Sequence, residues 1–278
     1  MTRNSLSLSD PNTSSFVFGA SGLLGQAIYK CLPQKKSGTY NKKKFNSCLK
    51  FSYKKLNDNK IISLISKYQN IYYCIALSDP KKCANNPKLS GQLNYLLPRK
   101  ISDLCARMNK KFIYFSTEYV FKGNTKTKIK EEDEPNNIQV YSRHKIAAEN
   151  YIKKNSKNYL ILRLAKIIGN SKQRTDFIQK WILTINKNQE VNIFTDQFVK
   201  PIVINNVCIW TKKLVNKNCS GIYHLSGDKI YSRKVLFEKF VRKKLKKRLQ
   251  KKIKFIITPS SLPKSLFLSN QKVKAILK

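Results

Sequence analysis

Tyr141 and Lys145 stand four residues apart at the start of a predicted helix, in the segment Tyr141-Ser-Arg-His-Lys145. Residues at this spacing lie on the same face of a helix, one turn apart. An ammonium group beside a phenol stabilises the phenolate and lowers the pKa of the phenol from its usual value of about 10. Such a phenol can donate a proton to the alkoxide that forms when a carbonyl group is reduced. A Tyr four residues before a Lys is very common in proteins. Whether this pair is catalytic therefore depends on its position in the fold.

A predicted strand at 112–117 precedes this pair and ends in Ser116-Thr117. In parallel α/β sheets, ligands bind at the carboxyl ends of the strands. The hydroxyl groups of Ser116 and Thr117 are therefore expected at the edge of the sheet where a substrate would lie. This position strengthens the interpretation of Tyr141 and Lys145 as a catalytic pair.

Three glycines, Gly19, Gly22 and Gly25, connect a short apolar strand at 15–18 to a helix at 23–32. Glycines at this spacing permit a tight turn, a close approach of the backbone to a pyrophosphate, and close packing of the helix on the sheet. The free N–H groups at the start of the helix then face the phosphates. A glycine triplet in the first strand–helix unit of an alternating chain predicts a dinucleotide site.

The loop after the second predicted strand bears on the choice of cofactor. Dinucleotide folds usually place an acidic residue about 20 positions after the glycines, where it binds the ribose hydroxyls. Here the strand ends at Tyr40, and Asn41 and Lys42 follow, with two further lysines. Cations in place of a carboxylate suit a 2′-phosphate, which favours NADPH, with NADH as the alternative. Lysine is so abundant in this chain that a chance occurrence also explains the loop.

Strand and helix patterns alternate from residue 15 onward, which is typical of a parallel sheet with helices on both faces. We therefore expect an α/β fold: a Rossmann-type doubly wound parallel sheet with a smaller, interleaved C-terminal substrate-binding lobe. Residues 1–13 are polar and are interpreted as a leader. The expected boundaries place the NAD(P)-binding domain at 14–168, with 190–226 returning to it, and the substrate-binding lobe at 169–189 and 227–278.

The chain of 278 residues has 56 Lys+Arg against 15 Asp+Glu, a formal net charge of +41. This charge makes nucleic acid the first partner to consider. Only nine of these residues are Arg, however, and nucleic-acid sites favour Arg for bidentate contacts. Lys, Asn and Ile all have codons rich in A and T, so a drift in base composition explains the excess equally well. We expect no nucleic-acid partner.

The densest basic segment, 239–254, keeps apolar residues close to one helical stripe and predicts an amphipathic helix with a basic solvent face. Contact of that face with an anionic surface is the alternative. No segment is apolar enough to span a membrane, and the first fifteen residues lack the apolar core of a secretory signal. Seven cysteines without a CxxC pair argue for reduced thiols, so we expect a cytoplasmic protein. No cluster of residues suggests a metal site.

Together these segments resemble the extended short-chain dehydrogenase/reductase family, and most closely its dTDP-4-dehydrorhamnose reductase branch. The resemblance covers nearly the whole chain after the leader. The matching segments are Phe-Gly-Ala-Ser-Gly-Leu-Leu-Gly (18–25), Ser-Thr-Glu-Tyr-Val-Phe-Lys-Gly (116–123), Tyr-Ser-Arg-His-Lys (141–145), Asp-Gln-Phe-Val-Lys-Pro (196–201) and Gly-Ile-Tyr-His-Leu-Ser-Gly (221–227).

The resemblance implies NAD(P)H-dependent reduction of a nucleotide-linked 4-keto deoxysugar for cell-surface polysaccharides, and it allows a homodimer. Tyr141 takes the role of the proton donor. Thr117 takes the role of the hydroxyl that bonds the sugar carbonyl or the phenol, and Lys145 that of the residue that holds the nicotinamide ribose. The residues expected to contact the cofactor are Gly19, Ser21, Gly22, Leu23, Leu24, Gly25, Asn41, Lys42, Ala76, Leu77, Ser78, Tyr141 and Lys145.

Departures from the family pattern fall mostly on the substrate side. Glu118 stands where an Asp is usual, and Lys166 stands where the rhamnose enzymes carry an aromatic residue facing the sugar. A cation there suits a more polar or acidic sugar, unless Lys166 turns outward. The residues expected to contact the substrate are Thr117, Glu118, Lys166 and Gln197, with loop capping as an alternative for the last. Two other functions stay open: a sugar-nucleotide epimerase or dehydratase, and a non-catalytic NADP-binding regulatory subunit.

Overall fold

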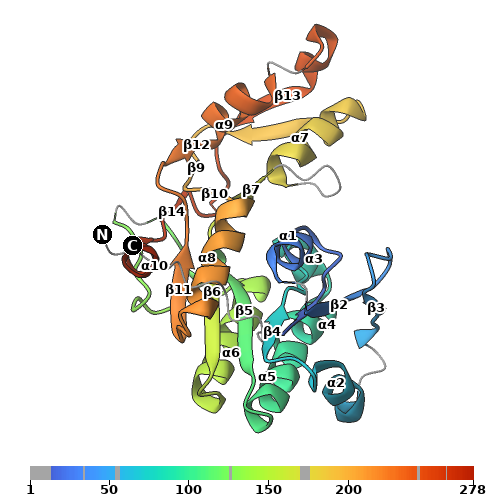
Figure 1. Cartoon of the computed structure of the whole chain (residues 1–278). Helices are drawn as coiled ribbons and strands as arrows, with labels where there is room; N and C mark the ends of the chain where they lie inside the picture. Colours follow the sequence, from blue (N-terminus) through green and yellow to red (C-terminus); the bar gives the residue numbers. More distant parts are fainter. Residues whose placement is uncertain are drawn as a thin grey trace, which may run out of the picture.

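A seven-stranded parallel sheet forms the centre of the protein (Figure 1). The computed structural model describes residues 14–33, 35–53, 57–124, 127–169, 176–242, 245–260 and 262–278; the expected leader at 1–13 lies outside them. Along the sheet the strands lie in the order β11 (Gly221–Leu225), β6 (Tyr159–Leu164), β5 (Lys111–Thr117), β4 (Asn70–Tyr73), β1 (Ser15–Phe18), β2 (Lys36–Tyr40) and β3 (Leu49–Lys50). The expected doubly wound α/β fold is confirmed.

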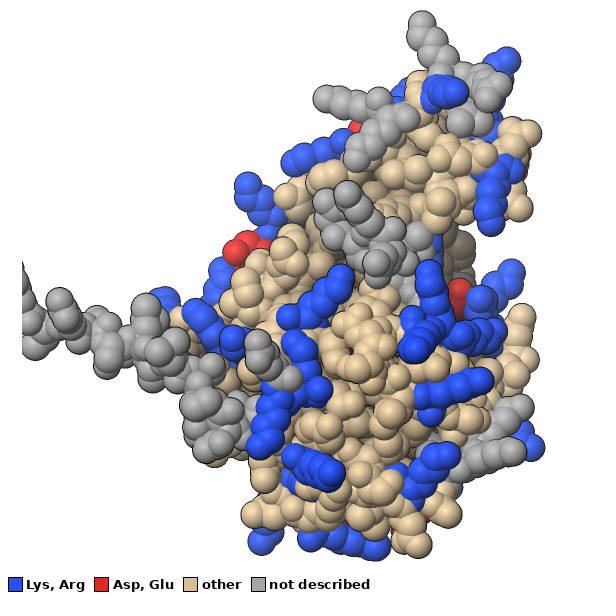
Figure 2. Space-filling view, turned by 45° about the vertical axis from the view of Figure 1, so that its right-hand side comes forward, with Lys and Arg blue, Asp and Glu red and all other residues tan. Residues whose placement is uncertain are grey.

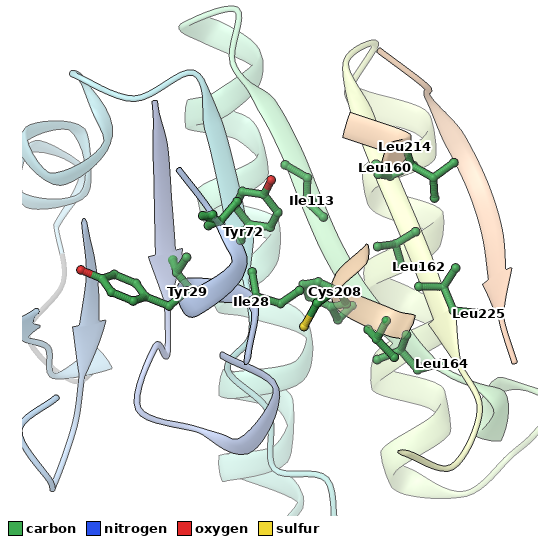
Figure 3. Close-up of a cluster of buried hydrophobic side chains, with 14 of the residues drawn as sticks. Ile28, Tyr29, Tyr72, Ile113, Leu160, Leu162, Leu164, Cys208, Leu214 and Leu225 are labelled. Carbon is green, nitrogen blue, oxygen red and sulfur yellow. The ribbon is translucent and has the colours of Figure 1, made fainter. Parts of the chain in front are cut away.

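Helices cover both faces of this sheet, because alternate residues of each buried strand point to opposite sides. In β5, for example, Ile113 faces one hydrophobic cluster and Phe112 faces the other. The first cluster is closed by α1 (Leu23–Cys31), α8 (Ile204–Asn216) and α10 (Gln271–Leu277). Figure 3 shows Ile28 and Cys208 of this cluster between the strands and the helices. The second cluster is closed by α2 (Asp58–Ile65), α5 (Leu97–Arg107) and α6 (Val140–Asn155).

Short elements connect the large sheet to the residues around its carboxyl edge. They are α3 (Pro80–Asn85), α4 (Pro87–Gly91), the π-helical turn η2 (Gln92–Leu96) and the 3₁₀ turn η3 (Glu118–Val120). β7 (Ile167–Ile168) pairs with β10 (Ile202–Val203), and β9 (Phe198–Val199) lies between β12 (Tyr231–Ser232) and β14 (Ser265–Leu266).

A smaller lobe has its own hydrophobic core above the carboxyl edge of the sheet (Figure 1). It consists of α7 (Phe177–Asn186), β8 (Val191–Phe194), α9 (Arg233–Phe240) and β13 (Ile253–Ile256). We expected residues 190–226 to return to the nucleotide-binding domain, but β8 pairs with β13 in the smaller lobe. The return to the large sheet begins with α8 and β11, so the two parts interleave later in the chain than the sequence suggested.

The expected basic helix at 239–254 is wrong. Helix α9 ends at Phe240, a 3₁₀ turn η5 occupies Lys247–Lys252, and β13 follows as a strand; Lys243 and Lys244 lie outside the described residues. Ile253 packs against the core of the smaller lobe while its strand pairs with β8. Strand pairing therefore outweighs the helical spacing, in a segment where lysines one turn apart would repel one another.

Basic side chains spread over the face seen in Figure 2 and do not gather into a single stripe, and acidic side chains are few there. In the described part of the chain, no helix has the length and apolar character that a membrane crossing requires.

Candidate active site

The glycine turn between β1 and α1 has the geometry that a close ligand contact needs. Gly19 adopts a φ of +81°, which side chains rarely tolerate. A Cβ on Gly25 would lie 2.1 Å from the carbonyl oxygen of Gly19, so the helix packs directly on the turn. Gly22 is the N-cap of α1 and supplies no capping side chain, which leaves the first N–H groups of the helix available to an anion.

A cleft of about 420 Å³ opens at the carboxyl ends of β1, β4, β5 and β6, next to this turn. Its wall includes most of the residues that the sequence assigned to catalysis, cofactor and substrate. These are Gly22, Leu23, Leu24, Ala76, Ser78, Thr117, Glu118, Tyr141, Lys145 and Lys166. Lys180 of α7 and the capping residue Asp176 close the cleft from the smaller lobe.

A second cavity of about 200 Å³ continues the cleft past the glycine turn and shares Gly22 and Ala76 with it. Gly19, Ser21 and Asn41 line this cavity, as expected for cofactor contacts. Three other expected residues line neither cavity. Gly25 acts in packing, Leu77 is held by backbone hydrogen bonds to the side chain of Asn94, and the side chain of Lys42 is exposed.

Tyr141 and Lys145 occupy the first turns of α6, and both point into the cleft beside Thr117, the last residue of β5. Lys145 is 1% exposed, donates a 2.6 Å hydrogen bond from Nζ to the carbonyl oxygen of Phe115, and lies 4.0 Å from the centre of the Tyr114 ring. Burial lowers the pKa of Lys145 to about 7, although the carboxylate of Glu149 acts in the opposite direction.

The expected lowering of the Tyr141 pKa is wrong. Burial raises the pKa of Tyr141 above its usual range, and a hydrogen bond with Thr117 reduces this effect only in part. The expectation considered only the effect of the Lys145 charge on the pKa of the phenol. It left out the burial of the phenol away from solvent, which raises this pKa. Tyr141 is therefore a neutral phenol at neutral pH, which is the form that can donate a proton.

The substrate side of the cleft carries polar atoms that no protein group satisfies. Glu118 is 3% exposed and its Oε2 has no hydrogen-bond partner in the described structure, and the same holds for Oγ of Ser116. Burial raises the pKa of Glu118 to about 7, against the lowering effect of Lys166. The ammonium of Lys166 lies 4.6 Å from the centre of the Tyr119 ring and lines the cleft, so it does not turn outward.

Gln197 is not brought to the cleft. Its Nε2 donates a 2.7 Å hydrogen bond to the carbonyl oxygen of Pro263, and its Oε1 accepts one of 2.8 Å from Arg233. The neighbouring Asp196 accepts hydrogen bonds from the backbone and side chain of Thr258 and forms an ion pair with Lys264. This segment therefore fixes loops of the C-terminal region, which is the alternative that the sequence left open.

Several residues of the site escaped the sequence analysis. Thr39 accepts a 2.9 Å hydrogen bond from the N–H of Gly19 and so holds the glycine turn against β2. A basic pocket of about 330 Å³ lies beside Ser21 and is also lined by Lys30, Lys43 and Lys44. The run of lysines after Tyr40 was the available signal, but it did not tell which of them face inward.

Comparisons with known proteins show the family to which the chain belongs. The profile of the family described as RmlD substrate binding domain matches residues 14–277. The chain is 29% identical over 223 residues to the probable low-salt glycan biosynthesis reductase Agl14 of Haloferax volcanii, covering 77% of this chain and 74% of that protein. It is 26% identical over 232 residues to methionine adenosyltransferase 2 subunit beta of Bos taurus, covering 78% and 68%.

A solved structure, dTDP-4-dehydrorhamnose reductase of Bacillus anthracis in complex with NADP, superposes with a TM-score of 0.75 at 20% identity. The superposition covers 95% of this chain and 91% of that one, which supports the fold throughout. The match of the family profile to almost the whole chain decides the family. The chain belongs to the RmlD substrate binding domain family, which groups sugar-nucleotide reductases within the extended short-chain dehydrogenase/reductases.

Proposed function

We propose that the chain is an NADPH-dependent reductase of a nucleotide-linked 4-keto deoxysugar, serving the synthesis of cell-surface polysaccharides. One observation carries the proposal: Thr117, Tyr141 and Lys145 line the same cleft as the glycine turn. The cleft thus joins a dinucleotide site to a proton donor. The names of two relatives, a glycan biosynthesis reductase and a dTDP-4-dehydrorhamnose reductase, support the same substrate class.

The residues of the turn fit a dinucleotide. Gly19 and Gly22 present backbone without side chains to the two cavities, and the open N-terminus of α1 offers N–H groups to a pyrophosphate. Ala76 and Ser78, at the end of β4, continue this surface toward the catalytic residues. When bound, the nicotinamide supplies the hydride.

The catalytic residues then act on the carbonyl group. Tyr141, kept as a neutral phenol by burial, donates its proton to the carbonyl oxygen as negative charge develops there. Thr117 hydrogen-bonds the phenol and orients it. Lys145 is fixed by Phe115, and in its ammonium form it favours the developing oxyanion.

Ser116, Glu118 and Lys166 form one side of the cleft, called here the substrate wall, and this wall suits a sugar with several polar groups. The unpartnered oxygen of Glu118 and the hydroxyl of Ser116 offer hydrogen bonds to sugar hydroxyls, because a buried polar atom without a partner is costly. Lys166 adds a cation on the same wall, and Lys180 reaches the cleft from the smaller lobe, where it suits a diphosphate.

The basic pocket supports NADPH as the cofactor. It adjoins the cavity that contains Asn41 and shares Ser21 with it, so a 2′-phosphate on the adenosine ribose would meet Lys43 and Lys44. Among the described residues, no carboxylate lines either of these two cavities. Of the three lysines that the sequence analysis put in place of the carboxylate, Lys43 and Lys44 therefore take this role, whereas Lys42 lies outside the pocket.

A regulatory, non-catalytic role is the second candidate, because several relatives are named methionine adenosyltransferase 2 subunit beta. Such a role would need a fold that binds the cofactor, but it would not need catalytic turnover of a substrate.

The deciding experiment follows NADPH oxidation against a panel of nucleotide-linked 4-keto sugars. We expect consumption with at least one sugar, and we expect Tyr141→Phe to reduce kcat about 100-fold or more while NADPH affinity stays nearly unchanged. A kcat of Tyr141→Phe within a factor of two of the wild type would overturn the mechanism. Tight NADPH binding without consumption of any sugar would favour the regulatory role.

A further inference from the structure

A chain of buried charges lies directly behind Lys145, and the mechanism above does not use it. Arg163 on β6 and Glu149 on α6 are each 1% exposed. The guanidinium donates hydrogen bonds to both oxygens of the carboxylate, to Oε2 from Nη2 at 2.8 Å and from Nε at 3.1 Å, and to Oε1 from Nε at 3.3 Å. Two charges that are fully removed from water, so near an active site, need an explanation beyond packing.

Glu149 follows Lys145 by one turn of α6, and both side chains belong to the buried face of that helix. The titratable groups that face Lys145 come from three elements: Cys74 after β4, Tyr114 on β5, and Tyr141 and Glu149 on α6. Thiols and phenols are neutral at neutral pH when buried. Glu149 is therefore the carboxylate among these groups that can balance the charge of the lysine.

Arg163 is itself held from two other directions. Its Nη1 donates a 3.3 Å hydrogen bond to the carbonyl oxygen of Glu131 and lies 3.4 Å from Nε2 of His224 on β11. The fork of the guanidinium therefore cannot swing away from Glu149 without losing contacts on two sides. Both oxygens of Glu149 receive hydrogen bonds from it, so the carboxylate stays in place one turn along α6 from the lysine.

We propose that Glu149 is a positioning residue that keeps Lys145 in its ammonium form inside the cleft, and that Arg163 holds the side chain of Glu149 in place for this task. The inference rests on the proposed function, in which Lys145 contacts the cofactor and the reacting oxygen. Its physical basis is that a buried ammonium tends to lose its proton, and that a fixed carboxylate nearby opposes this loss. The lowered pKa of Lys145, with Glu149 as the largest opposing influence, agrees with this arrangement.

The test is Glu149→Gln, which preserves shape and removes the charge. The alkaline limb of the kcat/KM profile, and the pH at which NADPH affinity falls, should both move to lower pH by about 1 unit or more. Glu134→Gln, an exposed site with the same change of charge, should leave both midpoints unmoved. NADPH affinity is measured without any sugar, so this arm still decides the inference if no panel sugar is reduced.

Two further variants separate charge from folding, since Glu149→Gln leaves Arg163 buried without its anion. Glu149→Asp keeps the charge and should retain the wild-type midpoints even if the protein melts earlier. The double variant Glu149→Gln with Arg163→Met removes both charges, so its thermal stability should recover while the shift to lower pH remains. Equal shifts in the Asp and Gln variants, or wild-type midpoints in the double variant, would show that Glu149 acts only through the fold.

Discussion

The two walls of the cleft differ in how completely their polar groups are satisfied. The cofactor wall consists of the glycine turn, Thr39, Tyr141 and Lys145. There the side chains of Thr39 and Lys145 each hydrogen-bond a backbone group of the protein. On the substrate wall, Ser116 and Glu118 each bury a side-chain oxygen that has no partner within the described residues. Buried polar atoms are nearly always paired, so the difference marks where a ligand completes the structure. The protein itself preorganises the cofactor wall, whereas the proposed function assigns the sugar the role of completing the substrate wall.

The largest effect is expected from breaking the cofactor wall at Lys145. Lys145→Ala removes the hydrogen bond to Phe115 and the positive charge beside the phenol. We expect kcat/KM to fall by about 100-fold or more, together with a clear loss of NADPH affinity, because one group serves both tasks. Steady-state kinetics and a fluorescence titration of NADPH measure the two effects separately.

Lys153→Ala is the matched control, because Lys153 lies on the same helix with an exposed side chain. It should leave both quantities unchanged. A Lys145→Ala protein with normal NADPH affinity would mean that the lysine serves the proton donor alone.

Most of the cofactor wall could be predicted from the sequence because most of its residues, unlike Thr39, are fixed by local spacing. Gly19, Gly22 and Gly25 lie within a single strand–helix turn, and Tyr141 and Lys145 lie within one turn of a helix. Short-range geometry of this kind is the same in every chain with the pattern. The centre of the sheet could be predicted for a similar reason, since β1, β4, β5 and β6 are largely continuous apolar runs.

The rest depends on contacts between distant segments. β13 pairs with β8 across about sixty residues of sequence. The lysine-rich pattern of 239–254 does not indicate that part of this segment pairs with β8 as a strand. Gln197 was assigned to the substrate, but its amide reaches Pro263 instead. The burial of Glu118 and Tyr141 likewise comes from the packing of the cleft, and burial sets the direction of both pKa shifts.

The substrate wall can be tested through the stability of the protein, where we expect a smaller effect than that of Lys145→Ala on activity. Burial raises the pKa of Glu118 from 4.5 to about 7, so the folded state holds this proton more tightly than the unfolded state. Wild-type stability is therefore lost progressively as pH rises from about 4.5 to about 7, by up to roughly 3 kcal/mol. Glu118→Gln removes the ionisable group and should gain stability relative to the wild type at pH 8.5 but much less at pH 5.

Urea unfolding at the two pH values measures this difference, and Glu134→Gln provides the exposed control. The same Glu118→Gln variant should lower kcat/KM for the sugar by about 10-fold, since it loses a charge-assisted hydrogen bond. Gain of stability with loss of activity is the behaviour expected of a group kept for a ligand. An activity equal to that of the wild type would place the sugar elsewhere in the cleft.

The smallest effect is expected at the outer end of the cofactor wall, where the structure separates the three adjacent lysines that the sequence grouped together. Lys43 and Lys44 line the basic pocket beside Ser21, whereas Lys42 does not. Exchanging both pocket lysines for serine should weaken NADPH binding by roughly 10-fold through the lost attraction to the 2′-phosphate, and should leave NADH binding unchanged. Lys42→Ser changes one charge of the same loop outside the pocket, so it should leave the ratio of the two affinities near that of the wild type.

The salt dependence of binding offers a second measurement. Because these lysines are exposed, added salt should reduce the difference between the NADPH and NADH affinities in the wild type more than in the double variant. If Lys42→Ser alone abolished the preference for NADPH, the 2′-phosphate would lie on the outer side of the loop, and the basic pocket would have no part in choosing the cofactor.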